Sequence, residues 1–217
     1  MKVSTDACLQ GAWTPIGANV KQVLDAGAGT GLLSLMLAQR NHDIEIDAIE
    51  LDDNAANQAK ENILNSPWAE RINVINADIR NYNFKRKYDF ILCNPPFFQN
   101  SLLGDNVERN NARHTLTLNY TDIIMLMENV LADDGYASVL LPYTELERWQ
   151  DLLNDKGWPI TKQLIVQPRA ELKANRVVTI CSRKQEGFID ERLTIYTQEN
   201  KYSGDAVKLL APFYLNL

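Results

Sequence analysis

Residues 94–97 place a side-chain amide, two prolines and an aromatic ring in direct succession: Asn94, Pro95, Pro96 and Phe97. The apolar run before them, residues 88–93, is typical of a buried parallel strand. Two consecutive prolines fix φ and remove two backbone donors, so the strand is predicted to end there. The Asn94 side-chain oxygen and the Pro95 carbonyl then offer two acceptors beside a flat ring. Such a site suits a planar amino group, for example N6 of an adenine.

The chemistry expected of this site is activation of a weak nucleophile. The amino lone pair of adenine is delocalised into the ring, and acceptors that bond both amino hydrogens favour the pyramidal form in which the lone pair is available. Phe97 is predicted to stack on the target ring. The alternative is that Asn94 and the prolines only form a turn that ends the strand.

Four apolar segments, residues 23–26, 44–50, 72–77 and 88–93, have the length and composition of parallel strands. Helical patterns follow the first two, at residues 32–39 and from Asp52 or Asp53 to Asn65. This order predicts an α/β, Rossmann-like fold. Ligands of open parallel sheets bind outside the carboxyl ends of the strands. The polar residues at the four strand ends are therefore predicted to line one crevice: Asp25, Glu50, Asp78 and Asn94.

A glycine-rich turn, with Gly27, Gly29 and Gly31, connects the first strand to its helix and is typical of a nucleotide-derived cofactor. A dinucleotide would place its pyrophosphate against Asp25, and those two groups repel each other. S-adenosylmethionine (SAM) has no phosphate, and its ammonium and sulfonium groups suit that carboxylate. Glu50, about twenty residues beyond the turn, suits the ribose hydroxyls.

Two further cofactor contacts are expected. Asp78 can accept a hydrogen bond from the exocyclic amine of the cofactor adenine, and Asn94 borders both cofactor and target. The alternative for each carboxylate taken singly is a helix cap or turn residue.

The rest of the chain is predicted from its periodicity and turn residues. Residues 99–119 are polar and without period, which indicates either a mobile lid over the site or a disordered loop. We expect an early helix towards Trp13, capped by Thr5 or Asp6. The later elements are expected as helices at 121–131 and 145–155, a strand at 136–141 after a turn at 133–135, an antiparallel pair at 160–166 and 176–182 closing the sheet edge, a short strand at 193–197 and a helix from 205.

Composition narrows the class of protein. The 217 residues carry a net charge of −6 and are 45% hydrophobic, as is ordinary for a soluble globular domain. No signal-peptide or membrane-spanning stretch is visible, and the three cysteines and two histidines have no metal-ligand spacing. We therefore expect one domain, residues 1–217, in the cytoplasm and without metal. Residues 156–184 are rich in lysine and arginine, so this segment is a candidate for phosphate binding, with a merely solvated face as the alternative.

Two motifs together resemble the class I SAM-dependent methyltransferases that modify planar nitrogens: residues 25–31 (Asp-Ala-Gly-Ala-Gly-Thr-Gly) and residues 94–97. Further stretches are similar to the bacterial tRNA1(Val) (adenine(37)-N6)-methyltransferase family, over nearly the whole chain and most strongly up to about residue 120. These stretches are residues 1–6, 11–13, 66–72, 112–115 and 213–215. The resemblance implies a seven-stranded sheet, SAM as methyl donor and an adenine next to the anticodon as target. It also leads us to expect a further segment before Met1 and a glycine in place of Ser4.

The hypothesis is therefore a monomeric tRNA methyltransferase with catalytic residues Asn94, Pro95, Pro96 and Phe97. Besides Phe97, the substrate is expected to contact Arg113, Arg169, Lys173 and Arg176. Two alternatives share the same motif, namely N2-guanine methyltransferases of ribosomal RNA and glutamine methyltransferases of release factors. An alternative of another class is a catalytically silent module that binds SAM or RNA.

Overall fold

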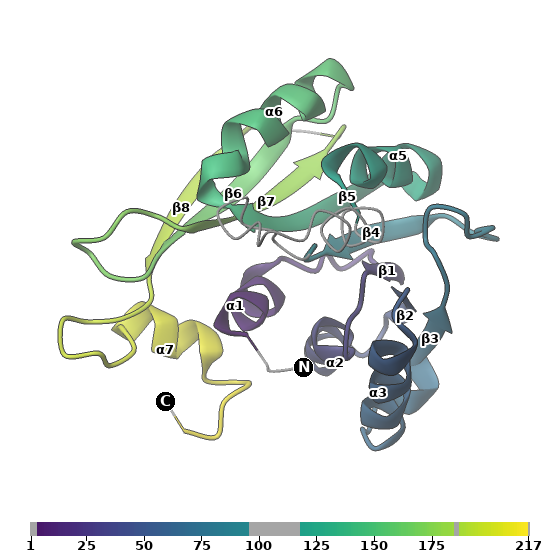
Figure 1. The fold of residues 1–217 in the computed structure, drawn as a ribbon, viewed down its shortest axis with the longest axis horizontal. Coiled ribbons are helices and arrows are strands. Elements are labelled where there is room, and N and C mark those ends of the chain that lie inside the picture. The colour runs from purple at the N-terminus through teal and green to yellow at the C-terminus, as the bar shows by residue number, and fades with distance from the viewer. Residues whose placement is uncertain (1–3, 96–117, 185–186, 217) are drawn as a thin grey trace, which may run out of the picture.

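The computed structural model describes residues 4–95, 118–184 and 187–216, and its centre is one twisted sheet (Figure 1). The described strands form a sheet of eight, in the order β3-β2-β1-β4-β5-β7-β6-β8. Their bounds are β1 Gln22–Ala26, β2 Glu45–Glu50, β3 Ile72–Asn76, β4 Tyr88–Cys93, β5 Leu131–Pro142, β6 Ile160–Gln167, β7 Arg176–Ser182 and β8 Ile189–Thr194. Strands β1 to β5 are parallel, and β7 is antiparallel to both its neighbours.

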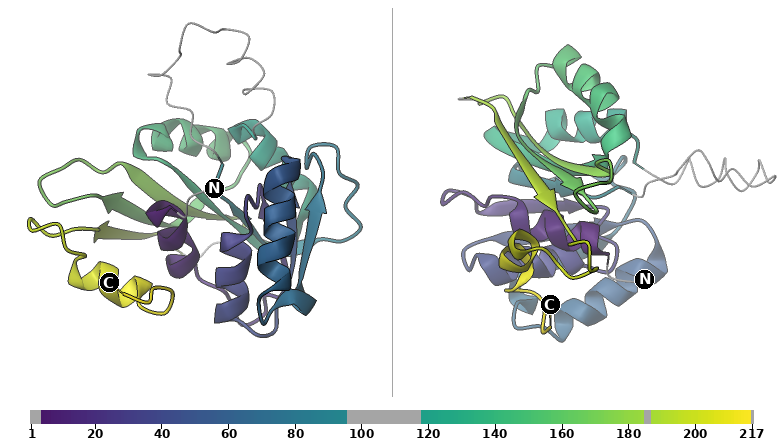
Figure 2. Two further views of the ribbon diagram at one scale, coloured as in Figure 1. Left: turned by 60° about the horizontal axis from the view of Figure 1, so that its bottom comes forward. Right: turned by 90° about the vertical axis from the view of Figure 1, so that its left-hand side faces the viewer.

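Helices cover both faces of the sheet (Figure 1). One face carries α1 (Thr5–Trp13), α2 (Leu32–Arg40), α3 (Asp53–Leu64) and α7 (Gly204–Leu210); the other carries α5 (Tyr120–Val130) and α6 (Leu146–Asp155). Two 3-10 turns, η1 (Ala69–Arg71) and η3 (Tyr143–Glu145), precede β3 and α6. The C-terminal helix α7 lies beside α1, and the two share a core cluster (Figures 1 and 2).

Alternation along the strands explains the two layers. Val23 and Leu92 pack with Leu37 of α2 on one face. Leu24 follows Val23 and Ile91 precedes Leu92, so both side chains point to the opposite face of the sheet, where they pack with α5 and α6. Because both faces are covered, the strands read as nearly continuous apolar runs, which is why the first four could be predicted and are confirmed within one or two residues.

The prediction of seven strands was wrong by one. β8 begins earlier than expected, at Ile189, and pairs in parallel with β6. Lys162 of β6 forms an ion pair with Glu191 of β8 at 2.9 Å, and Gln163 donates to Asp190 at 2.8 Å. The antiparallel pairing of β6 and β7 is confirmed, but β8 and not this pair forms the edge of the sheet. β8 was not predicted from residue 189 because its first residues are mostly charged. These charged side chains bond to side chains of β6, the strand with which β8 is paired.

Other boundaries differ for local reasons. Ser4, rather than Thr5 or Asp6, caps α1, because its side chain accepts the Ala7 N–H at 3.1 Å. The turn expected at residues 133–135 is instead a bulge inside β5, where the register passes from Tyr88–Leu131 to Phe90–Tyr136. A Cβ on Gly135 would meet the Ala132 carbonyl at 2.9 Å.

The proposed lid, residues 99–119, falls almost entirely outside the described residues. Its last residue, Asn119, is described and caps α5. Within the described part of the chain, no helix is long and apolar enough to cross a membrane.

Candidate active site

The register of the sheet brings the predicted strand-end residues to one edge, here called the carboxyl edge, where β1 to β5 end. Ala26 of β1 pairs with both Ile49 of β2 and Cys93 of β4. The next residues along these three strands are Gly27, Glu50 and Asn94. They therefore stand at the same level, with Glu50 and Asn94 on either side of Gln22–Ala26 and each about one strand spacing, roughly 4.8 Å, from the chain at Gly27. The register thus brings Glu50 and Asn94, two of the four residues predicted to line a crevice, to the same end of the sheet.

Asp25 is a buried carboxylate with one oxygen unused. Its side chain lies on the α2 face, where Oδ2 accepts the Ser34 hydroxyl at 2.6 Å and the Ser34 N–H at 3.1 Å. The other oxygen, Oδ1, is buried and has no partner among the described residues. Burial raises the pKa of Asp25 to about 6; the Ser34 bonds oppose this rise and the charge of Glu50 adds to it.

The glycine turn is held by backbone bonds and by Glu50. Glu50 Oε2 accepts the Gly29 N–H at 2.8 Å, and Oε1 accepts the Asp52 N–H at 2.8 Å. Gly27, Gly29 and Gly31 all have positive φ, at 76°, 57° and 80°. Gly27 is exposed, and a Cβ there would meet nothing within 4 Å, so the backbone of the turn is open to a ligand.

These observations test whether SAM would fit. An unpartnered buried carboxylate oxygen is costly unless a donor reaches it, and the ammonium group of SAM is such a donor. A turn of positive-φ glycines with open space beside Gly27 allows a ligand to approach the backbone closely. Glu50, with both oxygens directed by backbone N–H groups, keeps lone pairs for hydroxyl donors. The residues present therefore fit the cofactor.

Asp78 differs from the other acids because it has a cationic neighbour. Arg80 donates to Asp78 through Nε at 2.8 Å and through its terminal nitrogen at 2.7 Å. These side-chain bonds hold the pKa of Asp78 below its ordinary value. The role of Asp78 towards the cofactor adenine stays a prediction.

Asn94 and Pro95 follow β4 directly, with Asn94 half-buried and Pro95 buried. Pro96, Phe97 and Arg113 lie outside the described residues. Among the described residues no group of three or more histidine, cysteine or acidic side chains could hold a metal.

Comparison with known proteins gives the family. Residues 13–132 match the family model of the methyltransferase small domain. A relative from Aliivibrio fischeri, named tRNA1(Val) (adenine(37)-N6)-methyltransferase, is 41% identical over 217 residues, covering 100% of this chain and 92% of the relative. A relative of the same name from Bacteroides fragilis is 37% identical over 220 residues, covering 100% and 92%. The chain belongs to this methyltransferase family.

The fold agrees with this assignment. This chain is similar in fold to a protein from Agrobacterium tumefaciens whose crystal structure is described as that of a predicted O-methyltransferase. The TM-score is 0.74, and the matched region covers 95% of this chain and 96% of the other. Only 16% of the residues are identical, so this likeness concerns the fold alone. The predicted family and the Rossmann-like α/β fold are both confirmed.

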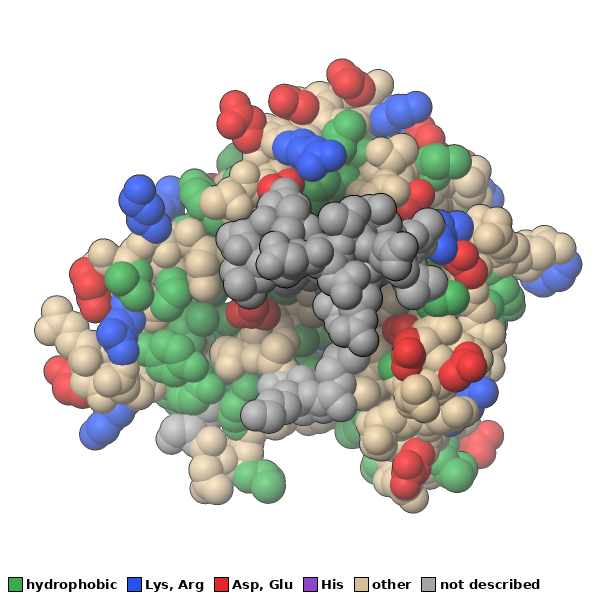
Figure 3. Space-filling view, in the orientation of Figure 1, with side chains coloured by type: hydrophobic (Ala, Val, Ile, Leu, Met, Phe, Trp, Pro, Cys, Tyr) green, Lys and Arg blue, Asp and Glu red, His purple; other side chains and the backbone are tan. Residues whose placement is uncertain are grey.

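The fold of the methyltransferase divides the basic segment 156–184 between two edges of the sheet. β6 runs in the same direction as β5, because both are antiparallel to β7. The loop between β6 and β7, residues 168–175, therefore lies at the carboxyl edge and carries Arg169 and Lys173, with Arg176 at the start of β7. Lys156 and Lys184 lie at the opposite edge. On the face shown in Figure 3, basic side chains are separate groups interspersed with acidic ones, not one continuous patch.

The three basic residues at the carboxyl edge have different surroundings. Arg169 donates to Asn200. Arg176 forms an ion pair with Asp6 of α1 at 2.8 Å and donates to the Asn175 carbonyl at 2.9 Å. Lys173 is exposed and forms no ion pair among the described residues.

Sequence reasoning missed two partners of the methyltransferase site, Ser34 and Asp6. Ser34 is the lone hydroxyl in the apolar helix α2, and that isolation was a signal that could have been used. Asp6 was considered only as a helix cap. Its ion pair with Arg176 joins residues 170 positions apart, and nothing local indicates it.

Proposed function

We propose that this chain transfers the methyl group of SAM to N6 of adenine 37 in tRNA1(Val). The observation that carries the proposal is the sheet register, which sets Asn94 at the level of Gly27 and Glu50. An acceptor for the target amine thus stands directly beside the features that fit the cofactor. The name of the relatives supports this choice of substrate.

SAM, when bound, supplies an electrophilic methyl group on its sulfonium. Asp25 would accept from the cofactor ammonium through Oδ1, the oxygen that Ser34 leaves unused. Glu50 would bind the ribose hydroxyls while it orients the glycine turn through Gly29. Asp78, orientated by Arg80, would accept from the cofactor adenine.

The target adenine must leave its stack, which costs a few kcal/mol and less in a loop than in a duplex. Phe97 would then stack on it, contributing roughly 1–3 kcal/mol. Asn94 and the Pro95 carbonyl would accept from the two amino hydrogens, and Pro96 would keep this strand end rigid. Positioning supplies most of the catalysis, so no strong general base is needed.

Binding of the tRNA backbone is proposed for Arg113, Arg169, Lys173 and Arg176. The last three lie at the carboxyl edge with Asn94, which favours their contact with an RNA whose base reaches the crevice. We further propose that residues 1–217 act as one domain, as a monomer, without metal and in the cytoplasm.

The deciding experiment measures transfer of labelled methyl from SAM to purified tRNA1(Val), with parallel pools of ribosomal RNA and release factor. Label in the tRNA, absent when adenine 37 is replaced by guanine, is the expected result. Label in guanine of ribosomal RNA or in release-factor glutamine would support the two alternatives with the same motif. SAM binding without transfer to any pool would indicate a silent binding module.

A second experiment tests the basic residues with a charge-matched control. Reversal of Arg169 and Lys173 to glutamate should weaken tRNA binding and flatten its salt dependence, because both residues lie at the carboxyl edge. The same charge change at the opposite edge, Lys156→Glu with Lys184→Glu, should leave binding nearly unchanged. Equal loss in the two double variants would show a general effect of net charge instead.

A further inference from the structure

A polar side chain of α1 reaches the peptide that precedes the amine-binding residues. Gln10 is fully buried. Its Nε2 donates to the Cys93 carbonyl at 3.1 Å, to the Ser138 carbonyl at 3.3 Å and to the Ser138 hydroxyl at 3.3 Å. Cys93 is the last residue of β4, so its carbonyl belongs to the peptide bond that joins it to Asn94. Gln10 thus connects α1 to the end of β4 and to Ser138 in the interior of β5.

Cys93 is paired with Ala26 of β1 and Val139 of β5, and two prolines follow shortly after it. Pro95 and Pro96 have no N–H groups, so they cannot donate to a neighbouring strand. Beyond this pairing, bonds that reach the Cys93 carbonyl help to fix the orientation of the Cys93–Asn94 peptide. Gln10 provides one such bond from a different layer of the molecule.

Helix α1 is held in place by contacts with other elements, so the Gln10 side chain that it carries has a fixed position. Arg40 of α2 donates to the Gly11 carbonyl at 2.6 Å. The Trp13 indole donates to Glu191 of β8 at 2.5 Å. Around Gly11 the packing is so close that an added Cβ would meet the Met36 sulfur at 2.8 Å. The part of α1 that follows Gln10 is therefore anchored on α2 and on β8.

The Gln10 amide is retained at an energetic cost. The carbonyl oxygens of Cys93 and Ser138 both face Nε2. If the amide were flipped, Oε1 would take the place of Nε2 and would face these two oxygens without a hydrogen between them. In the orientation present, Oε1 is buried without a partner among the described residues. A buried acceptor without a donor is destabilising, and a methionine of similar volume would have no such acceptor. A packing role alone would not favour glutamine here.

We propose that Gln10 is a positioning residue for methyl transfer. By holding the Cys93 carbonyl it fixes the Asn94 side chain and the Pro95 carbonyl in the geometry that the target amine requires. This inference rests on the proposed function of Asn94 and Pro95. It assigns Gln10 no contact with SAM or with the tRNA.

The test separates turnover from binding and stability. Gln10→Met keeps the side-chain volume and should lower kcat about 10–100-fold, because small displacements of positioned groups have effects of this size. The dissociation constant of SAM and the KM for tRNA should change less than about twofold. Ser138→Ala removes only the hydroxyl that accepts from Gln10, keeps both carbonyl acceptors, and should keep kcat within about threefold.

Thr179→Val is the matched control for loss of a buried hydrogen bond. Thr179 is fully buried in β7, accepts from Trp149 at 3.1 Å and donates to the Val139 carbonyl at 3.3 Å. Val139 is the β5 residue that pairs with Cys93, so this control removes a buried bond one strand further from the end of β4 and leaves the Gln10 bond in place. It should lower Tm without lowering kcat. A parental kcat in Gln10→Met, an equal loss of kcat in Thr179→Val, or failure of Gln10→Met and Gln10→Glu to fold would each overturn the proposal.

The proposed function is tested separately, by measuring methyl transfer by the parent protein to the same pools of tRNA, ribosomal RNA and release factor. If the parent methylates a substrate other than tRNA, the same variants are assayed on that substrate, and the inference about Gln10 stands or falls there. If the parent transfers no methyl group to any pool, the proposed function has failed and the inference, which rests on it, falls with it.

Discussion

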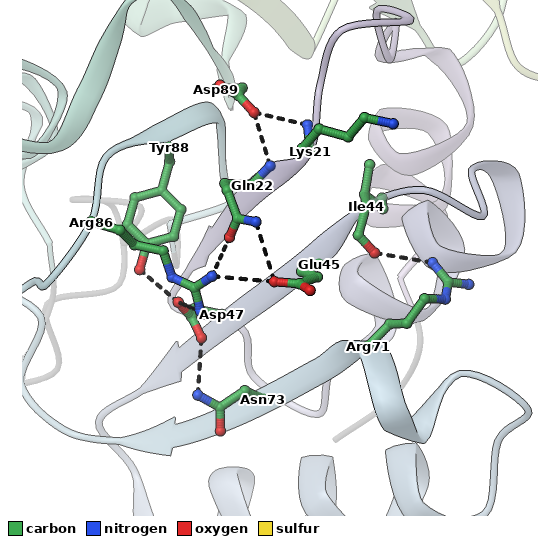
Figure 4. Close-up of polar contacts among 10 residues, drawn as sticks. All are labelled: Lys21, Gln22, Ile44, Glu45, Asp47, Arg71, Asn73, Arg86, Tyr88 and Asp89. Carbon is green, nitrogen blue, oxygen red and sulfur yellow. Dashed lines mark hydrogen bonds and ion pairs between the residues drawn. The ribbon is translucent and has the colours of Figure 1, made fainter.

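Two buried aspartates on neighbouring strands, Asp25 of β1 and Asp47 of β2, have opposite surroundings. Asp47 has both oxygens occupied: Oδ1 accepts from Asn73 at 2.9 Å, and Oδ2 accepts from the Tyr88 hydroxyl at 2.7 Å and pairs with Arg86 at 3.1 Å (Figure 4). Asp25 has one oxygen bonded to Ser34 and the other without a partner among the described residues. A carboxylate whose bonds are complete stabilises the fold, whereas one with an unused oxygen is suited to bind a ligand.

The register explains why the two carboxylates differ. Asp25 pairs with Ala48, and Asp47 pairs with Leu24, so the two side chains point to opposite faces of the sheet. The face of Asp47 meets Arg86 and Tyr88, which end the connection from β3 to β4 (Figure 4). That network also includes Gln22 and Glu45 and ties the connection to the sheet. The two faces therefore separate structural from functional polar groups, and substitutions should separate them too.

The largest expected effect is on the functional side. Asn94→Ala should lower methyl transfer by about 10²–10³-fold, by analogy with the loss of one preorganised hydrogen-bonding group. Because Asn94 is half-buried at the strand end, Tm and SAM affinity should stay close to those of the parent. Single-turnover kinetics with saturating SAM measures the effect. Lost stability with undiminished turnover per folded molecule would mean that Asn94 only ends the strand.

The second effect belongs to the structural carboxylate. Asp47→Ala leaves the buried Tyr88 hydroxyl and the Asn73 amide without their acceptor, so the free energy of unfolding should fall by about 2–3 kcal/mol. Urea denaturation measures it, and SAM affinity of the folded variant should not change. Glu45→Ala is the control, because its side chain is 63% exposed in its ion pair with Arg86, and its loss should cost less than about 1 kcal/mol. Reduced SAM affinity in Asp47→Ala would break the distinction between the two faces.

The sequence predicted one of these aspartates and not the other. Asp25 is the single acid of β1, whereas Asp47 lies between Glu45 and Glu50 in β2, and of the two aspartates only Asp25 is followed by glycines that indicated a ligand. The partners of Asp47 come from β3, from Arg86 before β4 and from Tyr88 at the start of β4, so its network could not be predicted from local pattern. The same limit applies to Gln10, whose partner Ser138 is 128 positions away. Strand ends follow from local chemistry, but cross-layer bonds follow from topology.

The third prediction is that a substitution in the core, Asp25→Asn, raises the stability of the protein, whereas most core substitutions lower it. Burial raises the pKa of Asp25 to about 6, above its unfolded value of about 3.9. The folded state therefore binds this proton more tightly, and the carboxylate costs stability progressively from about pH 4 to pH 6 and fully above pH 6. Asp25→Asn should be more stable than the parent at pH 7.5 by up to about 3 kcal/mol, and this gain should vanish near pH 4.

The same Asp25→Asn variant should lose SAM affinity by about 10–100-fold, because a charged partner of the cofactor ammonium is replaced by a neutral one. Paired denaturation and calorimetry at pH 7.5 test both signs together. A destabilised Asp25→Asn would show that the Ser34 bonds outweigh the cost of burial. Unchanged SAM affinity would remove Asp25 from the cofactor site.

The smallest expected effect is the pH dependence of SAM affinity, which should distinguish Asp25 from Asp47. SAM should require the ionised form of Asp25, so a proton competes with the cofactor ammonium for the same carboxylate. With a pKa of about 6 in the free protein, affinity should be nearly constant above pH 7 and about tenfold weaker at pH 5. Asp25→Asn should show no such slope, while Asp47→Ala should keep the parental slope, because its network lies on the other face of the sheet. Calorimetric titrations from pH 5 to pH 8 decide the matter. A flat profile in the parent would mean that the unused oxygen of Asp25 does not meet the cofactor, and the contrast between the two aspartates would then be one of hydrogen bonding alone.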